Sequence, residues 1–226
     1  MQFKEKMEQK NKNKAVIFDL DGTVIDTIYD ITDAMNEMTE KFGFRKVSVE
    51  VMKASLGGDT KDIVRLAIGE KISEQLLDKC AECYATTYIN SGSPKTEVFK
   101  GMEKVIRELK ERGYIILALS NKPDVEIAPL ADRLLKPLGF DKVVGLSEKV
   151  IPKPKPDGAL SLLKEFNASA ENSYFVGDGE TDILTGINAR ITPIAVLWGN
   201  RDKEFLKGYG AEIFARSPEE LLNLIK

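Results

Sequence analysis

Five short, continuous runs of apolar residues constrain the fold of this chain more than any other feature of its sequence. Continuous rather than alternating apolar residues are typical of strands that are buried on both faces, as in a parallel sheet. Helical patterns lie between the runs, as in residues 101–113, 157–166 and 217–226. This alternation predicts an α/β fold, with a Rossmann-like three-layer core built around a parallel sheet. The runs cover residues 15–18, 114–119, 143–146, 173–176 and 191–197.

One long segment interrupts the alternation of strands and helices. Residues 27–93 contain no convincing strand pattern, only helical patterns such as DITDAMNEMTEKFGF. The stretch SGSPK, at residues 91–95, then has the composition of a linker that returns to the core. We therefore expect two domains: a core of residues 1–26 and 94–226, and a small all-α domain of residues 27–93.

Composition and charge exclude several classes of protein. The formal net charge is only −3 and there is no basic block, so we expect no nucleic-acid partner. No uncharged stretch is long enough to cross a bilayer, so we expect no membrane partner. The first fourteen residues lack the apolar region of a signal peptide and are expected to form a solvated tail of a cytoplasmic protein. The chain has no histidine, which removes every catalytic or metal site that depends on one.

The two cysteines, Cys80 and Cys83, form a lone C-x-x-C on a helical pattern. Without a second pair of cysteines or histidines, this spacing does not define a zinc site. We expect the two thiols to be reduced and to pack inside the helical segment.

Polar side chains follow the predicted strands at the points where the strands end. The carboxyl ends of parallel strands meet at one edge of a sheet, so these groups are expected to converge. Each group alone also fits a helix cap, a turn or a solvated linker. Two acids one residue apart are harder to explain in this way, because a second acid adds repulsion and nothing to a turn. The residues that follow strands are Asp19 and Asp21, Ser120 and Asn121, and Asp178 and Asp182. A fourth cluster, with Lys153 and Lys155 in residues 152–158, precedes a predicted helix.

A joint functional interpretation explains these groups together. Three carboxylates, those of Asp19, Asp21 and Asp178, form an all-oxygen site of the kind that suits Mg²⁺, and the cation removes their mutual repulsion. Mg²⁺ held by few protein carboxylates commonly shares its ligands with a phosphate. Lys153 and Ser120 would then contact the other phosphate oxygens. One carboxylate can act as the nucleophile, which leaves a second to act as acid and base.

The order of these motifs resembles that of the haloacid dehalogenase (HAD) superfamily. The motifs are D-x-D-G-T, Ser-Asn, K-P-x-P and G-D-x-x-x-D, and SNKPD with GDGETDILTGINA looks most like phosphoglycolate phosphatases and their near relatives. The resemblance implies a Rossmann-like core with a helical cap inserted between the first and second motifs, where the strand-free segment falls. Gly179 stands where a serine is usual and Arg190 where a small residue is usual.

The resemblance also implies a role for each matching residue. It makes Asp19 the nucleophile, Asp21 the general acid and base, and Lys153 the family lysine, with Lys155 as the alternative by proximity. The main-chain carbonyl of Asp21 would complete the Mg²⁺ shell. The implied metal residues are Asp19, Asp21, Asp178 and the outer acid Asp182, and the implied substrate-binding residues are Thr23, Ser120, Asn121, and Gly57 and Gly58 in the cap loop.

We therefore expect a Mg²⁺-dependent phosphomonoester hydrolase that acts on a small phosphorylated metabolite such as phosphoglycolate through an aspartyl-phosphate. A phosphomutase of the β-phosphoglucomutase type, a pyrophosphatase and a nucleotidase are alternatives on the same core. A non-catalytic module that binds a phosphorylated ligand is a further alternative. Lys53, Lys61 and Arg65 are candidates to contact an anionic substrate tail, or are exposed charges on helices. The protein is expected to be a monomer or a small homo-oligomer.

Overall fold

The computed structural model describes residues 13–226, so most of the predicted N-terminal tail lies outside the described residues. A six-stranded sheet in the order β5-β4-β1-β6-β7-β8 forms its centre, and every pair of neighbouring strands is parallel. This confirms the predicted parallel α/β core. The strands are β1 (Ala15–Phe18), β4 (Ile115–Pro123), β5 (Lys142–Leu146), β6 (Tyr174–Gly177), β7 (Thr192–Val196) and β8 (Phe214–Ala215).

The strand order reverses at β1, which lies between β4 and β6. A crevice therefore forms at the carboxyl end of β1, because the connections on its two sides leave in opposite directions. Each predicted strand is present to within a few residues, and β4 continues beyond residue 119 to Pro123. The two-residue strand β8 was not predicted, since it is too short to show a pattern.

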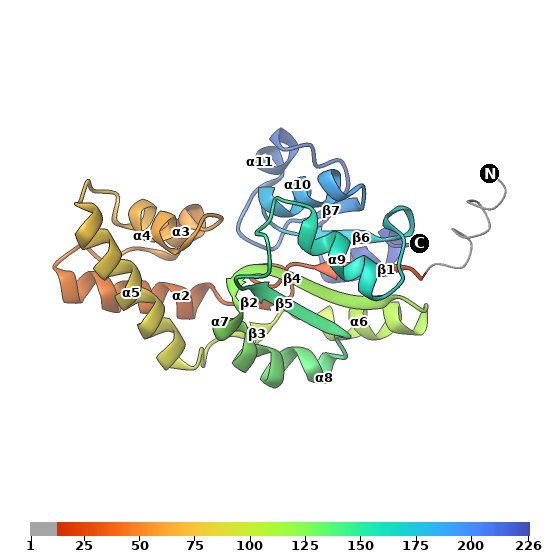
Figure 1. Ribbon diagram of the computed structural model, residues 1–226, viewed down its shortest axis with the longest axis horizontal. Helices are drawn as coiled ribbons and strands as arrows, with labels where there is room; N and C mark the ends of the chain where they lie inside the picture. The colour runs from red at the N-terminus through yellow and green to blue at the C-terminus, as the bar shows by residue number, and fades with distance from the viewer. Residues whose placement is uncertain (1–12) are drawn as a thin grey trace.

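Alternate residues of β1 pack into two separate layers. Val16 and Phe18 belong to the hydrophobic cluster that contains helix α6, whereas Ala15 and Ile17 belong to the cluster that contains helix α9. Figure 1 shows α6 and α8 on one side of the sheet and α9 and α10 on the other. The core therefore has three layers, as predicted. Its helices are α6 (Met102–Glu111), α7 (Asp124–Leu130), α8 (Lys136–Leu138), α9 (Asp157–Glu165), α10 (Glu180–Ala189), α11 (Lys203–Gly208) and α12 (Pro218–Leu224), with a π-helical turn at Ala131–Leu135 and a 3₁₀ turn at Ala170–Asn172.

Helix α6 shows how the sequence pattern produces this packing. Its four apolar residues, Met102, Val105, Ile106 and Leu109, lie on one face and are fully buried. Gly113 ends the helix with φ of 82°, and its N–H donates to the carbonyl of Lys110 at 2.9 Å. The amphipathic pattern and its glycine stop are both confirmed.

The segment between β1 and β4 carries a helical insert with its own core. Its buried residues include Met35, Met52, Leu77 and Tyr88, together with Cys80, whose thiol is free. No strand occurs between residues 28 and 91, as predicted, and Figure 1 shows these helices as a separate lobe. The helices are α2 (Ile28–Phe42), α3 (Val49–Ser55), α4 (Thr60–Ile68) and α5 (Glu74–Ser91).

The two chain crossings between core and insert lie side by side. Strands β2 (Ile25–Asp26) and β3 (Glu97–Val98) pair in an antiparallel ribbon that was not predicted. Next to this ribbon, the carboxylate of Asp30 accepts hydrogen bonds from the N–H of Lys95 at 3.0 Å and the hydroxyl of Thr96 at 2.7 Å. The crossings lie near the boundaries at residues 27 and 93, which stay a prediction. Within residues 13–226, no helix has the length and apolar character needed to cross a membrane.

Candidate active site

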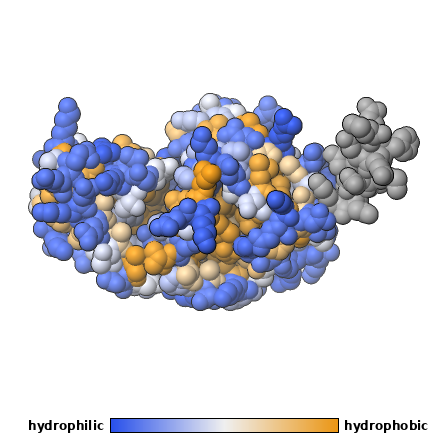
Figure 2. All heavy atoms as spheres, viewed as in Figure 1, coloured by the Kyte–Doolittle hydropathy of each residue, from blue (hydrophilic) through white to orange (hydrophobic). Residues whose placement is uncertain are grey.

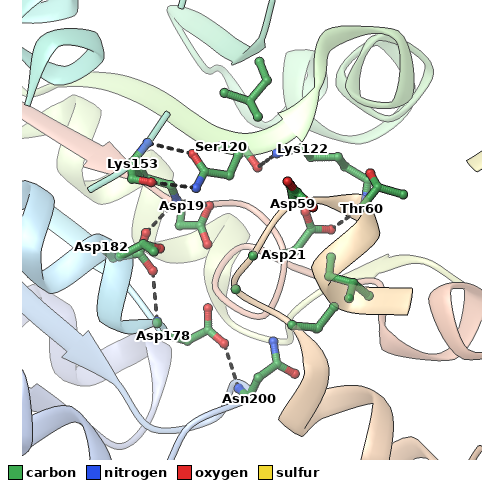
Figure 3. Close-up of a pocket in the computed structure, with 18 of the residues that line it drawn as sticks. Asp19, Asp21, Asp59, Thr60, Ser120, Lys122, Lys153, Asp178, Asp182 and Asn200 are labelled. Carbon is green, nitrogen blue, oxygen red and sulfur yellow. Dashed lines mark hydrogen bonds and ion pairs between the residues drawn. The ribbon is translucent and has the colours of Figure 1, made fainter. Parts of the chain in front are cut away.

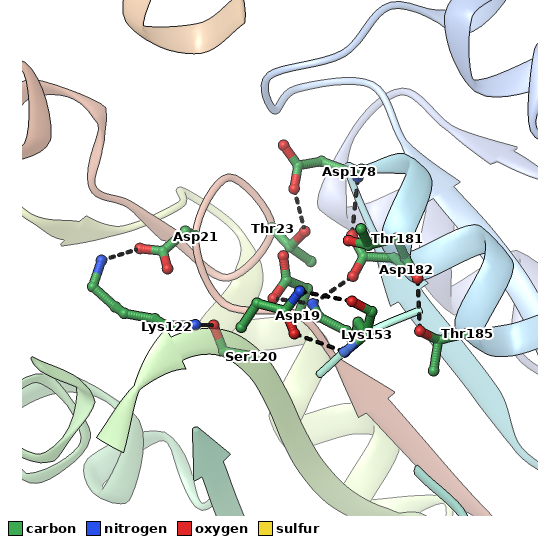
Figure 4. Close-up of polar contacts among 12 residues, drawn as sticks. Asp19, Asp21, Thr23, Ser120, Lys122, Lys153, Asp178, Thr181, Asp182 and Thr185 are labelled. Carbon is green, nitrogen blue, oxygen red and sulfur yellow. Dashed lines mark hydrogen bonds and ion pairs between the residues drawn. The ribbon is translucent and has the colours of Figure 1, made fainter. Parts of the chain in front are cut away.

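Asp19 is the first residue after β1 and lies at the crevice. Its N–H donates to the carbonyl of Val176 at 2.8 Å, which continues the pairing of β1 with β6. The ammonium of Lys153 lies 2.7 Å from Asp19 Oδ1 and 2.6 Å from Asp182 Oδ1 (Figure 4). The Lys153 side chain is only 3% exposed, so its charge depends on these two carboxylates rather than on water. Lys155, the alternative lysine, is exposed.

Asp178 and Asp182 come from the loop after β6 and the first turn of α10. Asp182 Oδ2 accepts the N–H of Gly179 at 2.9 Å, so this residue caps the helix and also binds Lys153. The two oxygens of Asp178 accept the hydroxyl of Thr23 at 3.2 Å and the N–H of Asn200 at 2.7 Å. Thr23, which the resemblance implied as a substrate-binding residue, therefore ties the Asp21 loop to Asp178 in this structure.

Three of these acids could hold a metal ion. Asp19, Asp178 and Asp182 are buried, and each offers an oxygen within 4.8 Å of the others. Burial and the neighbouring Asp182 raise the pKa of Asp19, while Lys153 opposes them. Burial and Asp182 also raise the pKa of Asp178 to about 7. The raised values reflect negative charges crowded away from water, and an all-oxygen set of this kind fits a hard divalent cation such as Mg²⁺.

For Lys153, the neighbouring charges outweigh the effect of burial on the pKa. Burial alone lowers the pKa of its ammonium group, but Asp182 and Asp19 raise that pKa by more. The lysine is therefore held in its charged form, which is the form that can contact a phosphate.

The Asp21 side chain lies outside this cluster. Its Oδ1 accepts hydrogen bonds from the hydroxyl of Thr27 at 2.6 Å and the ammonium of Lys122 at 2.9 Å. Lys122 also lies 4.4 Å from the ring centroid of Tyr88 in the insert. Its pKa is lowered by burial but raised by more through Asp21 and Tyr88. Of the four predicted metal residues, three carboxylates converge, and a metal contact through the main-chain carbonyl of Asp21 stays a prediction.

The glycine that follows the two acids of the first motif has a structural reason. Gly22 has φ of 81°, and a Cβ atom at this position would lie 2.3 Å from Asp178 Oδ2. A side chain would therefore push the motif away from the metal-binding acids.

The end of β4 supports the lysine as well as the predicted phosphate site. Ser120 is buried, and its hydroxyl accepts the N–H of Lys122 at 3.1 Å. The Asn121 amide accepts the main-chain N–H of Lys153 at 2.8 Å and donates to the main-chain carbonyl of Lys153 at 3.0 Å. In this structure Asn121 thus holds the backbone that carries Lys153.

Core and insert together line one cavity around these acids (Figure 3). Gly57 and Gly58, predicted to bind substrate, are part of its wall. Gly57 has φ of 117°, and a Cβ atom there would lie 2.9 Å from the carboxylate of Glu180. This glycine allows the loop of the insert to approach the core closely.

The cationic residues proposed for a substrate tail do not line this cavity. Lys61 forms an ion pair with Asp78, and Arg65 contacts Asp62 at 2.8 Å; all four side chains are about half exposed. Figure 2 shows the outer surface of the insert as largely hydrophilic, in agreement with this arrangement. In this structure, Lys61 and Arg65 are therefore exposed charges on helices, the second of the two possibilities considered for them.

Arg201, which the sequence did not indicate, joins the insert to the core. It lies after β7 and donates to the carbonyl oxygens of Lys53, at 2.7 Å, and of Leu56. Its Nε lies 3.3 Å from Glu180 Oε2. Lys53 therefore contributes its backbone rather than its charge to this contact. Arg201, like Thr27 and Lys122, meets its partners only in the folded chain.

The chain matches the family of haloacid dehalogenase-like hydrolases over residues 16–196 and therefore belongs to it. It is 30% identical to phosphoglycolate phosphatase 1 of Pseudomonas aeruginosa, over 82% of this chain and 70% of that protein. It is 28% identical to a phosphoglycolate phosphatase of Pseudomonas fluorescens, over 86% of this chain and 73% of that protein.

Solved structures give the same result. The crystal structure of a candidate phosphoglycolate phosphatase from Lactobacillus delbrueckii has a TM-score of 0.87 and 29% identity, and the match covers 95% of this chain and 98% of that one. The predicted superfamily, the α/β core with its helical cap, and the phosphatase class of enzyme are confirmed by these comparisons.

Proposed function

We propose that the protein is a Mg²⁺-dependent phosphomonoester hydrolase that acts on a small phosphorylated metabolite through an aspartyl-phosphate on Asp19. The observation that carries this proposal is the buried group at the end of β1, where Lys153 contacts Asp19 and Asp182 beside Asp178. Hydrolysis of a small phosphate ester is also what the names of the matched phosphoglycolate phosphatases describe. A cytoplasmic location and a monomeric or small homo-oligomeric state remain predictions.

Asp19, Asp178 and Asp182 are the residues that would hold the cation. When bound, Mg²⁺ supplies positive charge to the phosphate oxygens and offsets the repulsion among these acids. Lys153 and the Ser120 hydroxyl provide further hydrogen-bond donors to the phosphate. Thr23 and Asn121 position the groups that make these contacts, through Asp178 and the backbone of Lys153.

The two acids of the first motif then have different tasks. Lys153 occupies Oδ1 of Asp19, which leaves Oδ2 to attack phosphorus while the bond to the leaving oxygen breaks. Thr27 and Lys122 both occupy Oδ1 of Asp21, so its Oδ2 is available to give a proton to the leaving oxygen. Asp21 then takes a proton from the water that attacks the aspartyl-phosphate, and inorganic phosphate and free Asp19 are released.

The test measures phosphate release from a panel of small phosphate esters, with Mg²⁺ and with EDTA. Turnover should require Mg²⁺ and should disappear in Asp19→Asn, whose melting temperature should remain close to that of the unchanged protein. Asp132→Asn, which alters an exposed aspartate on the π-helical turn, is the matched control and should retain activity. Full activity of Asp19→Asn would refute the assignment of Asp19 as the nucleophile. Activity unaffected by EDTA would refute the dependence on a metal ion.

The phosphomutase alternative uses the same core residues and is separated by its products. Incubation with a hexose phosphate would give an isomer without free phosphate if the protein were a mutase. A non-catalytic binding module would give neither product with any ester of the panel.

A further inference from the structure

The wall of the cavity that faces the leaving group differs from the wall that faces the phosphate. Beyond Asp21, the insert contributes the apolar side chains of Ile31 and Ile63 and the phenol ring of Tyr84. Two acids complete this part of the wall: Asp59, before helix α4, and Glu126, on helix α7. We refer to these five residues as the leaving-group wall.

Every cation that lines the cavity within residues 13–226 already has an anionic partner. Lys153 is bound by Asp19 and Asp182, and Lys122 by Asp21. Arg201 is bound by Glu180 and by two carbonyl groups of the insert. The cavity therefore offers no spare positive charge to a second anionic group on a substrate.

This shortage has a direct energetic consequence. A carboxylate that leaves water for a partly buried wall without a cation loses its hydration and gains no ion pair in return. Asp59 and Glu126 would also repel it. An ester that carries a carboxylate beside its phosphate, such as phosphoglycolate, is thus poorly matched to this wall.

The wall that disfavours an anionic leaving group also contains a group, Glu126, that favours a hydrogen-bond donor. Its carboxylate is half-buried and has no hydrogen bond or ion pair to any other side chain of the described residues. Burial raises the pKa of the Glu126 carboxyl, and the nearby ammonium of Lys122 lowers it. The carboxylate therefore lies close both to the apolar part of the wall and to Lys122. Its oxygens can accept a hydrogen bond from a substrate.

We propose that the leaving group of the physiological substrate carries no anion and presents a hydrogen-bond donor, a hydroxyl or an ammonium group, to Glu126. The inference rests on the proposed phosphomonoesterase function and deepens it. It makes the leaving-group wall, and Glu126 in particular, the determinant of which small ester is cleaved.

A matched series of two-carbon esters tests this inference. Phosphoglycolate, 2-hydroxyethyl phosphate, phosphoethanolamine and ethyl phosphate differ only in the group at the second carbon: a carboxylate, a hydroxyl, an ammonium or hydrogen. The hydroxyl and ammonium esters should each have a kcat/KM at least about tenfold above that of phosphoglycolate, with ethyl phosphate between. Comparison of 2-hydroxyethyl phosphate with phosphoethanolamine also tells whether a hydroxyl or an ammonium is preferred. A kcat/KM for phosphoglycolate equal to or above the others would overturn the inference.

Two variants connect the preference to the wall. Glu126→Gln should raise the phosphoglycolate to phosphoethanolamine ratio of kcat/KM by about tenfold, because it removes one negative charge. Thr60→Lys, at a partly exposed cavity position labelled in Figure 3, should raise the same ratio by adding a cation. Glu111→Gln, at the exposed end of α6, is the matched control and should keep the original ranking.

Melting temperatures of both variants show whether they remain folded. Unchanged ratios in two folded variants would refute the role of the wall. If no ester in the series and no chromogenic phosphate is hydrolysed with Mg²⁺, the proposed function itself fails, which is a different result from a wrong order of preference.

Discussion

The two walls of the cavity are built on opposite principles. On the core side, the side chain of Lys153 is 3% exposed, and its ammonium group forms ion pairs with Asp19 and Asp182. On the insert side, the cavity is lined by Ile31, Ile63 and Tyr84 together with the acid Asp59. Cations of the insert such as Lys61, which is 50% exposed, contact acids on the outer surface. Buried charges are costly to leave without a partner, whereas exposed pairs contribute little. The buried charges of the core therefore serve the chemistry, whereas the residues proposed to select the substrate come from the insert and, in Glu126, from helix α7 of the core.

The largest effect should come from Lys153→Met, which removes the charge that both Asp19 and Asp182 depend on. We expect kcat/KM to fall by about 10²–10³-fold, and the free energy of unfolding to fall by about 3–5 kcal/mol because two buried carboxylates lose their counter-charge. Kinetic assays and denaturant unfolding measure the two changes. Lys155→Met, at the neighbouring exposed lysine, should change neither, and equal effects of the two variants would contradict the contrast between buried and exposed charges.

The next effect concerns pH and metal. Asp178 has a pKa of about 7 in the folded chain, against 3.8 for the free side chain. The folded state therefore keeps a proton that the unfolded chain has lost, so the stability of the metal-free protein should fall as pH rises from about 4 to 7. Mg²⁺ binds the deprotonated acids, so the rise in melting temperature that it produces should grow over the same window.

Thermal unfolding with and without Mg²⁺ at several pH values measures this growth. Asp178→Asn should abolish most of it. A rise in melting temperature that is equal at pH 5 and pH 8 would argue against a metal held by these acids.

A smaller effect is expected from Arg201→Gln, which weakens the contact between insert and core. Loss of the donors to the carbonyl groups of Lys53 and Leu56 should loosen the insert over the cavity. We expect KM to rise by about tenfold with a smaller change in kcat. Steady-state kinetics test this, with Arg216→Gln as a control at an exposed arginine. An unchanged KM would mean that this contact does not shape the substrate site.

The smallest effect should follow Lys61→Ala and Arg65→Ala. Both side chains form exposed ion pairs away from the cavity, so kcat/KM should stay unchanged even for anionic esters. Assays with phosphoglycolate provide the sharpest check. A clear loss of activity there would show that cations of the insert reach the substrate, and the contrast between the two walls would not hold.

The sequence predicted the parts of the site that local pattern determines. Acids directly after an apolar strand reach the sheet edge because a parallel sheet brings its strand ends together, so Asp19 and Asp178 were within reach of sequence reasoning. Lys122 and Arg201 were missed because their partners lie far from them in sequence. Thr27 was missed because no pattern shows that its hydroxyl turns back to Asp21.

Similar reasons explain the other differences. Lys122 stands inside the quoted motif SNKPD, but nothing in that motif shows that its side chain meets Asp21, 101 residues away in sequence. The two-residue strands of the β2–β3 ribbon and β8 are too short for any periodicity. The alternation of long runs and amphipathic helices, by contrast, was sufficient to predict the layered core.

The antiparallel ribbon of β2 and β3 has a consequence for how such a protein can change over time. The chain leaves the core and re-enters it at adjacent points, so the backbone connects the helical insert to the core only at this ribbon. Replacement of the insert by another folded domain would therefore leave the sheet intact. A core domain of this kind can in this way acquire a new substrate specificity when its inserted domain is exchanged.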